Sequence, residues 1–364
     1  MKEKLDKTVR SAKDFFQKTA DRAKQKQTPA FFKNITDAFA ILWEKVKLFL
    51  KSGVDFTPPA KEKIVSFVLK WWHWALGGIF AFVILYYPAG ALLYHRIDLN
   101  PRFGAGEVKD QQIQSLNTLA ELIGREIDKH AFTPNLPFFF PAALLDNMPA
   151  FQTGIIDGAQ KTAAVFARVN PQAESLKNAA ERLAYPASVW HIDAWKPAVS
   201  SVKKYRTARH LILEYESEVK EGRQTFNASA DALKTIAGDL ADNLKECIGE
   251  INRQVAAGEK KVLDTQADNV FYNIKGRSYV YFLITRDLKT DFKEAFSDEV
   301  LKNKWEKAVS SLKQAVLLQP MIVVNGAAET QFAPNHLLGL GFYLAQAAMD
   351  LTEMTQIIRQ AENE

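Results

Sequence analysis

The longest stretch of apolar residues lies between Lys70 and Arg96, and it contains no Asp, Glu, Lys or Arg. Trp71 to Tyr94 would form a helix of about 36 Å at about 1.5 Å per residue. A bilayer core is about 30 Å thick and needs about 20 apolar residues. Aromatic side chains that favour the membrane interface stand near both ends of the stretch: Trp71, Trp72, Trp74, Tyr86, Tyr87 and Tyr94. We predict one transmembrane helix within residues 61–96, and the alternative is a buried core helix.

Residues 97–364 show apolar positions at alternating spacings of three and four, which is typical of amphipathic helices. Such seams predict an extracytoplasmic helical bundle with long antiparallel helices or coiled-coil contacts, and therefore an all-α fold. The main seams are Ile113, Leu116, Ala120, Ile123 and Ile127; Tyr205, Ala208, Ile212, Tyr215 and Val219; Leu233, Ala237, Leu240, Leu244, Cys247 and Ile251; and Gly341, Leu344, Ala348, Leu351, Thr355 and Ile358.

Two regions leave the helical pattern ambiguous. Residues 197–258 fit one long helix, or a hairpin that breaks at Gly222 and the turn-prone Asn-Ala-Ser at 227–229. Residues 271–284 fit either a helix or a small β-hairpin around Gly276, and we favour helix from Ser278 onward. The sequence alone does not decide either point.

The N-terminal tail, residues 1–60, is basic and amphipathic. Its stronger apolar stripe runs over residues 31–49, and Ser52-Gly53 is a stop signal for that helix. A basic amphipathic helix beside a membrane helix favours binding to anionic headgroups, and the alternative is packing against a partner or a second copy. The tail lacks a nucleic-acid-binding pattern, so we expect no nucleic-acid partner.

The charge is distributed unevenly along the chain. Residues 1–70 carry 16 Lys and Arg against 8 Asp and Glu, while residues 71–364 carry 31 against 34. Positive segments stay in the cytoplasm. We therefore predict a cytoplasmic N-terminus and an extracytoplasmic domain over residues 97–364.

A search for catalytic chemistry finds little. Phosphate-binding, dinucleotide-binding, zinc-protease and nucleophile-elbow motifs are absent from the sequence, so we predict no cofactor and no metal. His191 lies near Asp193 between two tryptophans, which favours a structural histidine over a catalytic dyad. Cys247 falls on an apolar seam and is interpreted as a small buried hydrophobic residue. Asp146 and Glu181 are the candidate acids if the protein is an enzyme.

The proline-rich segment from Phe132 to Gly154 interrupts the helices, because four prolines in it forbid a plain helix. Phe138-Phe139-Phe140 is too short to span a membrane, and would lie in the core or at the membrane surface. We place a possible interaction surface around residues 144–154 of this segment, with turn-forming, adaptable and anchoring side chains: Asp146, Asn147, Met148, Phe151 and Gln152. The alternative is that Met148 and Phe151 fill the end of the bundle and Asp146 caps the next helix.

A short echo joins this segment to the C-terminal region. "FTPN" at 132–135 recurs as "FAPN" at 332–335, each before an apolar helical stretch. Asn135 and Asn335 suit helix N-caps. The alternative is that the two form halves of one binding surface.

The motifs "LDNMPAFQTG" (145–154), the preceding "FTPN" and "HLLGLGFYLAQAAMDLTEM" (336–354) resemble a bacterial envelope family known as domain of unknown function twenty-three thirty-three. The resemblance is expected to cover most of the chain from the membrane helix onward. It implies an inner-membrane protein of proteobacteria, whose extracytoplasmic domain over residues 97–364 is periplasmic, and it implies no activity.

Two classes of function follow. The first is a non-enzymatic structural or interaction module of the cell envelope, whose partners are the lipid bilayer and an envelope protein or a second copy. The second is a cell-wall-acting enzyme, or else a membrane-anchored module that binds a ligand.

Overall fold

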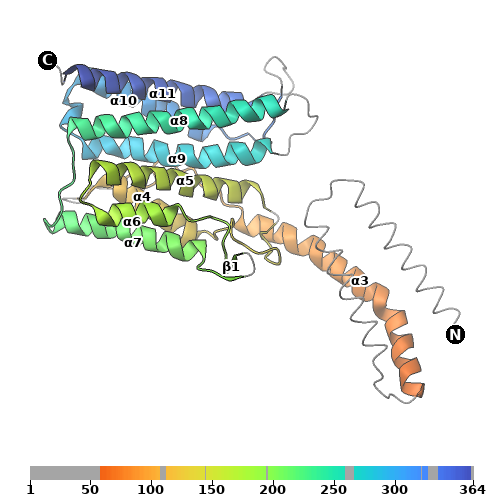
Figure 1. The fold of residues 1–364 in the computed structure, drawn as a ribbon. Helices are drawn as coiled ribbons and strands as arrows, with labels where there is room; N and C mark the ends of the chain where they lie inside the picture. Colours follow the sequence, from red (N-terminus) through yellow and green to blue (C-terminus); the bar gives the residue numbers. More distant parts are fainter. Residues whose placement is uncertain are drawn as a thin grey trace. The chain divides into compact units, whose positions relative to one another are not determined.

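A computed structural model describes residues 58–106, 112–143, 145–193, 196–258, 266–320, 322–326 and 335–361 (Figure 1). The predicted amphipathic stripes of the N-terminal tail lie outside the described residues. The chain divides into two compact units, Met1–Leu85 and Tyr86–Glu364, and each is described by itself. The division falls inside one helix, whereas the sequence placed the boundary near residue 96.

Helix α3 (Pro58–Tyr94) has 37 residues and contains Pro88 in its interior. Within the described residues, it holds one stretch that is long and apolar enough to cross a membrane, Gly77–Tyr94. Only 6% of that stretch is buried. A core helix would bury most of such a stretch, so the exposure favours a membrane helix over the core-helix alternative.

The second unit is a bundle of helices, as predicted (Figure 1). One group is α4 (Gln114–Gly124), which continues into a π-helical turn (Arg125–Lys129), α5 (Asn147–Val169), α6 (Glu174–Leu183) and α7 (Ser201–Lys220). The other group is α8 (Ala230–Gly258), α9 (Ala267–Asp291), α10 (Glu299–Leu317) and α11 (His336–Ala361), with a 3₁₀ turn at Ala295–Ser297. Helices α5 and α9 pack together and join the groups.

The predicted seams supply much of the core. The seam of α4 is buried along its length, from Ile113 to Ile127, and α7 buries Tyr205, Ala208, Ile212 and Tyr215. Cys247 is fully buried on α8, and burial raises the pKa of its thiol to about 11. The cysteine is therefore an inert core residue, as its position on the seam indicated.

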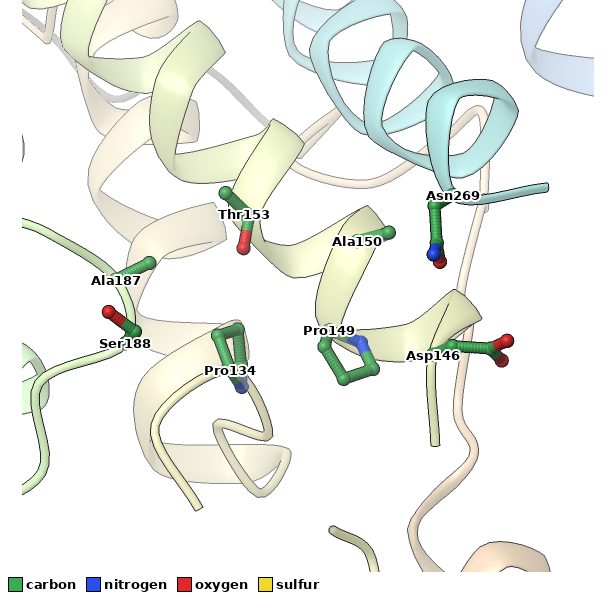
Figure 2. Close-up of a pocket in the computed structure, with 8 residues that line it drawn as sticks. All are labelled: Pro134, Asp146, Pro149, Ala150, Thr153, Ala187, Ser188 and Asn269. Atoms are coloured by element: carbon green, nitrogen blue, oxygen red, sulfur yellow. The ribbon is translucent and has the colours of Figure 1, made fainter. Parts of the chain in front are cut away.

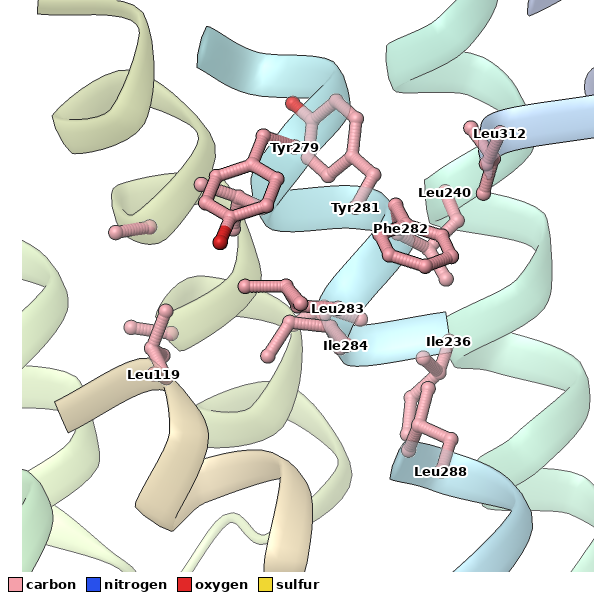
Figure 3. Close-up of a cluster of buried hydrophobic side chains, with 14 of the residues drawn as sticks. Leu119, Ile236, Leu240, Tyr279, Tyr281, Phe282, Leu283, Ile284, Leu288 and Leu312 are labelled. Atoms are coloured by element: carbon pink, nitrogen blue, oxygen red, sulfur yellow. The ribbon is translucent and has the colours of Figure 1, made fainter. Parts of the chain in front are cut away.

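The ambiguous region at 271–284 is helical throughout, since α9 runs from Ala267 to Asp291. This helix lies between the two groups and is buried on nearly every side, so it has no amphipathic stripe to read. Figure 3 shows Tyr279, Phe282 and Ile284 of α9 among side chains of neighbouring helices, such as Leu119 and Ile236.

Glycines allow α5 and α9 to approach closely. A Cβ at Gly154 would collide with the carbonyl oxygen of Asn273, and a Cβ at Gly276 would collide with that of Phe151. A Cβ at Gly158 would lie 3.1 Å from Val280 of α9, which is closer than ordinary packing contact. Gly276, which made 271–284 resemble a hairpin, therefore serves helix packing.

Residues 197–258 form two helices that separate at the predicted break, where Gly222 adopts a φ of +75°. They are not a packed hairpin, however. Helix α7 packs on α4 and α6, while α8 packs mainly on α11. The link between them, residues 221–229, crosses from one group to the other (Figure 1).

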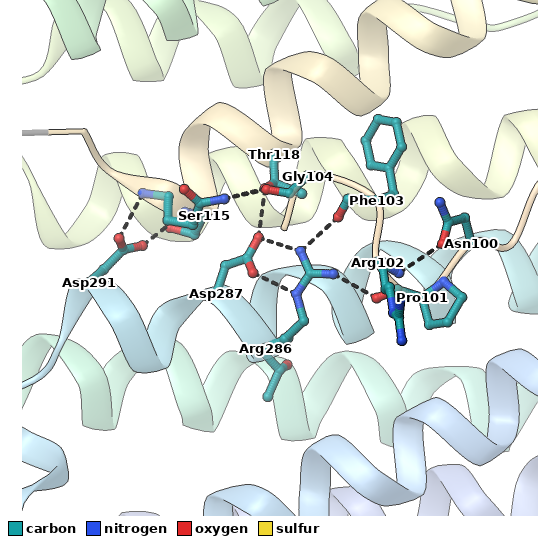
Figure 4. Close-up of polar contacts among 12 residues, drawn as sticks. Asn100, Pro101, Arg102, Phe103, Gly104, Ser115, Thr118, Arg286, Asp287 and Asp291 are labelled. Carbon is teal, nitrogen blue, oxygen red and sulfur yellow. Dashed lines mark hydrogen bonds and ion pairs between the residues drawn. The ribbon is translucent and has the colours of Figure 1, made fainter. Parts of the chain in front are cut away.

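The segment after α3 lies against α9. Arg286 donates from its guanidinium to the carbonyl oxygens of Pro101 and Phe103, at 2.7 and 2.8 Å (Figure 4). Asp287 accepts from Arg286 and from the Thr118 hydroxyl. Tyr279 donates to the Asn100 carbonyl at 2.9 Å. These bonds fix the connection between α3 and the bundle.

The bundle has two ends, which we name by their residues. The anchor end carries the last turns of α3 (Tyr86–Tyr94) and the segments 130–146 and 184–200. The far end carries the links 170–173, 221–229 and 292–298 (Figure 1).

Candidate functional site

A cleft of about 480 Å³ opens at the anchor end, which we call the α5 cleft (Figure 2). Its walls come from four separate segments of the chain, and the lining residues are Pro134, Asp146, Pro149, Ala150, Thr153, Ala187, Ser188 and Asn269. Most are small or are prolines. Asp146 is the one ionisable residue of that lining.

The first turn of α5 forms one wall. Asp146 is the N-cap, and its Oδ1 accepts from the backbone N–H of Asn147 at 2.8 Å. Pro149 stands in the first turn, where backbone N–H groups have no intrahelical partner, so its missing N–H costs nothing. The predicted capping role of Asp146 is confirmed.

Gln152 fixes the second wall of the cleft, which carries Pro134. Its Oε1 accepts from both the backbone N–H and the hydroxyl of Thr133, each at 2.8 Å. Its Nε2 donates to the Ala131 carbonyl and to Glu126 Oε2, each at 3.1 Å. This fully buried amide thereby holds the segment that carries Pro134 against α5.

The Glu126 carboxylate is itself held. Arg125 donates to Glu126 Oε1 at 2.8 Å and lies 3.2 Å from Asp98. Burial alone would lower the pKa of Arg125, but Glu126 and Tyr279 outweigh that effect and raise it. The buried charges are therefore paired, as buried charges must be.

The third wall, Ala187 and Ser188, is fixed through the carbonyl of Val189. That oxygen accepts from the Asn135 amide at 3.3 Å and from the Ser201 hydroxyl at 2.7 Å. The fourth wall is the start of α9, where Asn269 lies; one turn on, the Asn273 amide lies 3.5 Å from the Ala150 carbonyl. The cleft is thus preformed by buried hydrogen bonds.

The residues predicted as an interaction surface divide into two sets. Asp146 is exposed and lines the cleft, and Asn147 is half-buried beside it. Met148, Phe151 and Gln152 are fully buried, so they offer no surface. This is a correction: they pack under the cleft, because the start of α5 faces α9 and the 131–133 segment.

The two asparagines of the echo also differ. Asn335 is an N-cap, since its Oδ1 accepts from the Leu338 N–H at 3.0 Å. Asn135 is not a helix cap; it is buried and donates to Val189 instead. The two have different partners, because Asn335 donates to Asn325 and Gly326. The rest of "FAPN" lies outside the described residues.

Four lining residues escaped the sequence analysis: Pro134, Ala187, Ser188 and Asn269. Near two of them lies a short antiparallel pair, β1 (Ile192–Asp193) and β2 (Lys196–Pro197), which was not predicted. His191 is exposed beside Trp190, with ring centroids 5.0 Å apart. Its exposure fits a surface histidine, and the side chain of Asp193 is outside the described residues.

Near the lining residue Asp146, burial raises the pKa of the Tyr272 hydroxyl, with smaller contributions from Asp268 and Asp146. Two further groups with displaced pKa values are not part of the cleft lining. Burial, together with Asp291 and Glu121, raises the pKa of Glu216 to about 8. Burial lowers the pKa of Lys275 to about 8, and its ammonium donates to the Leu318 carbonyl. Over the described part of the chain, no group of three or more His, Cys, Asp or Glu side chains could hold a metal ion.

Of the predicted membrane-interface residues, Trp71 and Trp74 are exposed, and Trp72 has no described side chain. Tyr86 and Tyr87 belong to the bundle's unit and donate to the carbonyls of Phe139 and Phe138, at 3.0 and 2.8 Å. Tyr94 is the last residue of α3 and is half-buried.

A family model described as "Uncharacterized protein conserved in bacteria (DUF2333)" matches residues 135–361. The match covers the bundle from the segment before α5 to the end of α11, which is most of the chain from α3 onward, as the resemblance implied. No curated protein and no solved structure matches the chain significantly.

Proposed function

This chain belongs to the bacterial family DUF2333, and from that premise we propose that it is a single-pass inner-membrane protein whose periplasmic helical domain is a structural or interaction module of the cell envelope. The observation that carries the proposal is the α5 cleft, whose walls are preformed and whose lining contains one ionisable residue, Asp146.

The preformed walls favour binding. Gln152, Asn135 and Ser201 fix three segments around the cleft before any partner arrives. A surface that is already ordered loses less conformational entropy on binding. The small lining side chains leave room for a partner's side chains, and Ser188 and Asn269 offer hydrogen-bonding groups.

The same lining argues against catalysis. Acid–base catalysis needs a titratable side chain that is within hydrogen-bond reach of the proton it transfers. Among the described lining residues Asp146 stands alone, and its Oδ1 is engaged in the helix cap. Glu181 is exposed on α6 and does not line the cleft. The runner-up within the binding class is a small-molecule ligand in this cleft.

Charge supports the orientation. The excess of Lys and Arg in residues 1–70 favours a cytoplasmic N-terminus, which leaves the bundle in the periplasm. Alkaline phosphatase fused after Glu364 is expected to be active, and a fluorescent protein fused at Met1 is expected to fluoresce. A silent phosphatase on a functional fusion would reverse the orientation.

The binding role is tested by photo-crosslinking in native membranes. A photoreactive residue at exposed Ser188 is expected to give a discrete adduct, and the same residue at exposed Val300, at the far end, is expected to give none. The adduct is either an envelope protein or a second copy of the chain.

A cleft-filling variant, Ala187→Trp, supplies the matched control. It is expected to remove the Ser188 adduct and leave the melting temperature unchanged. Identical adducts at Ser188 and Val300, or a Ser188 adduct that survives Ala187→Trp, would exclude the cleft as a binding site.

A further inference from the structure

A second apolar surface lies at the anchor end, outside the α5 cleft. Phe138 is 68% exposed and Phe139 is 50% exposed, next to the last turns of α3. The edge of the Trp190 ring lies near Phe139 and Phe140, with centroids 5.8 and 6.2 Å apart. We call Phe138, Phe139 and Trp190 the aromatic edge.

Two hydrogen bonds set the depth of this edge. Tyr86 and Tyr87 lie on α3 inside the candidate span, and their hydroxyls donate to the Phe139 and Phe138 carbonyls. Tyr86 precedes the end of the span at Tyr94 by about 12 Å, at about 1.5 Å per residue. The headgroup region on each side of a bilayer is only about 5–8 Å thick. If α3 spans the membrane, the edge therefore lies as deep as the hydrocarbon boundary.

The loop is held at that depth by close packing. A Cβ at Gly90 of α3 would collide with Pro141, so the loop after the three phenylalanines rests directly on the helix backbone. This contact belongs to the same unit as the bundle. The edge therefore has a fixed position relative to the last turns of α3.

The backbone of the loop suits an apolar environment, where unpaired polar groups are costly. The tyrosine hydroxyls occupy the carbonyls of Phe138 and Phe139, and the Phe140 N–H donates to the Pro137 carbonyl at 2.9 Å. Pro137 and Pro141 have no N–H to satisfy. Residues 132–145 contain no Asp, Glu, Lys or Arg, and neither do residues 186–190.

From this geometry we propose that the aromatic edge is a second membrane contact, in which Phe138 and Phe139 insert into the bilayer leaflet beside α3 and Trp190 lies at the interface. The inference rests on the proposed membrane span. Transfer of exposed phenylalanine side chains from water into lipid is favourable, and indole rings favour the interface level. The bilayer is the occupant because Tyr86 and Tyr87, which lie inside the candidate span, hold the loop that carries the edge.

The test uses the full-length chain in phosphatidylcholine–phosphatidylglycerol vesicles. Cys247→Ala removes the one cysteine of the sequence, and single cysteines are then placed at Phe138, Leu85 and Val300 for labelling with an environment-sensitive fluorophore. Leu85 lies inside the candidate span, and Val300 is an equally exposed apolar residue at the far end. Lipids brominated on the acyl chains act as quenchers.

The label at Phe138 is expected to lose most of its emission to the brominated lipids, as the label at Leu85 does, and the label at Val300 is expected to lose none. Quenching at Leu85 without quenching at Phe138 would overturn this inference alone. Failure to quench at Leu85 would overturn the membrane span itself.

Two further measurements use the same label at Phe138. Gly90→Leu is expected to displace the loop and reduce quenching at Phe138, while quenching at Leu85 stays unchanged; an unchanged Phe138 signal would overturn the fixed depth. Oxidative crosslinking of unlabelled Phe138→Cys is expected to give no dimer. An efficient dimer without quenching would assign the edge to a second copy of the chain and overturn the proposal.

Discussion

The two ends of the bundle are built from the same helices but are closed in different ways. At the far end the links bind one another: Asn170 accepts from the Tyr215 hydroxyl and from the Asn227 N–H, and Phe226 packs against Phe292. At the anchor end the segments fix their own backbones but leave a cleft and exposed aromatic side chains. We therefore expect a partner to bind at the anchor end and not at the far end.

The largest expected effect tests whether the two ends are equally well packed beneath their surfaces. Phe151, near the anchor end of α5, and Phe166, near its far end, are both fully buried. Phe151→Ala and Phe166→Ala are each expected to lower the free energy of unfolding by about 3–5 kcal/mol, through lost burial and a cavity. Chemical denaturation in detergent measures both.

A much smaller loss for Phe151→Ala than for Phe166→Ala would mean that the anchor end is loosely packed. That result would return Phe151 to the set of recognition residues, from which its burial now removes it.

The next effect sharpens the difference in how the links are held. Asn170→Ala leaves a buried hydroxyl and a backbone N–H without their acceptor, so a loss of about 2–3 kcal/mol is expected. Asn135→Ala removes one hydrogen bond of 3.3 Å, and it is expected to lower the free energy of unfolding by about 1 kcal/mol. Equal losses from thermal melts would contradict the view that the far end is the more tightly tied.

The stability of the protein is expected to depend on pH through Glu216, which lies near Asp291 at the end of α9. The folded-state pKa of Glu216 is raised to about 8, so the folded protein holds a proton that the unfolded chain releases above about pH 4.5. Stability is therefore lost as the pH rises from about 4.5 to about 8. Glu216→Gln removes this loss and is expected to stabilise by about 1–2 kcal/mol at pH 8.

Melting temperatures of Glu216→Gln and the parent protein at pH 5 and pH 8 test this expectation. The advantage of the variant should be larger at pH 8. An advantage that is the same at both values would show that Glu216 is ionised in the folded protein.

The smallest expected effect concerns chemistry at the anchor end. Asp146→Ala is expected to cost about 1 kcal/mol through the lost cap, and Glu181→Ala, on an exposed helix face, almost nothing. Neither is expected to change glycan cleavage, because none is expected from the purified chain. Muropeptide release by the parent protein, lost in either variant, would make the anchor end an active site.

The sequence predicted the elements that bury one face. The seams of α4, α7, α8 and α11 recur every three or four residues, and these positions form the core. Helix α9 was favoured only from Ser278 onward, because burial on nearly every side removes the apolar stripe and Gly276 also fitted a hairpin. The break at Gly222 could be predicted from the local sequence. The different packing partners of α7 and α8 could not, because they depend on tertiary contacts between distant segments.

The site was predictable only in part. Asp146 could be recognised in the sequence as a turn-forming and capping residue in a proline-rich segment. Ser188 and Asn269 reach the cleft through the packing of distant segments, and neither carries a sequence signal. Met148 and Phe151 were ambiguous because the side chains that anchor a partner are also the ones that fill a core.

Helix α3 runs without a break into the unit that holds the bundle, and this affects how the bundle would meet a partner. A domain on a long flexible tether would sweep a wide volume and meet partners at many heights. On the proposed membrane span, the cleft would stay at a fixed height above the bilayer, since Tyr86 and Tyr87 bind the loop that leads into it. Partners that are themselves confined to the membrane would search for it in two dimensions, and a partner dissolved in the periplasm would gain no such advantage.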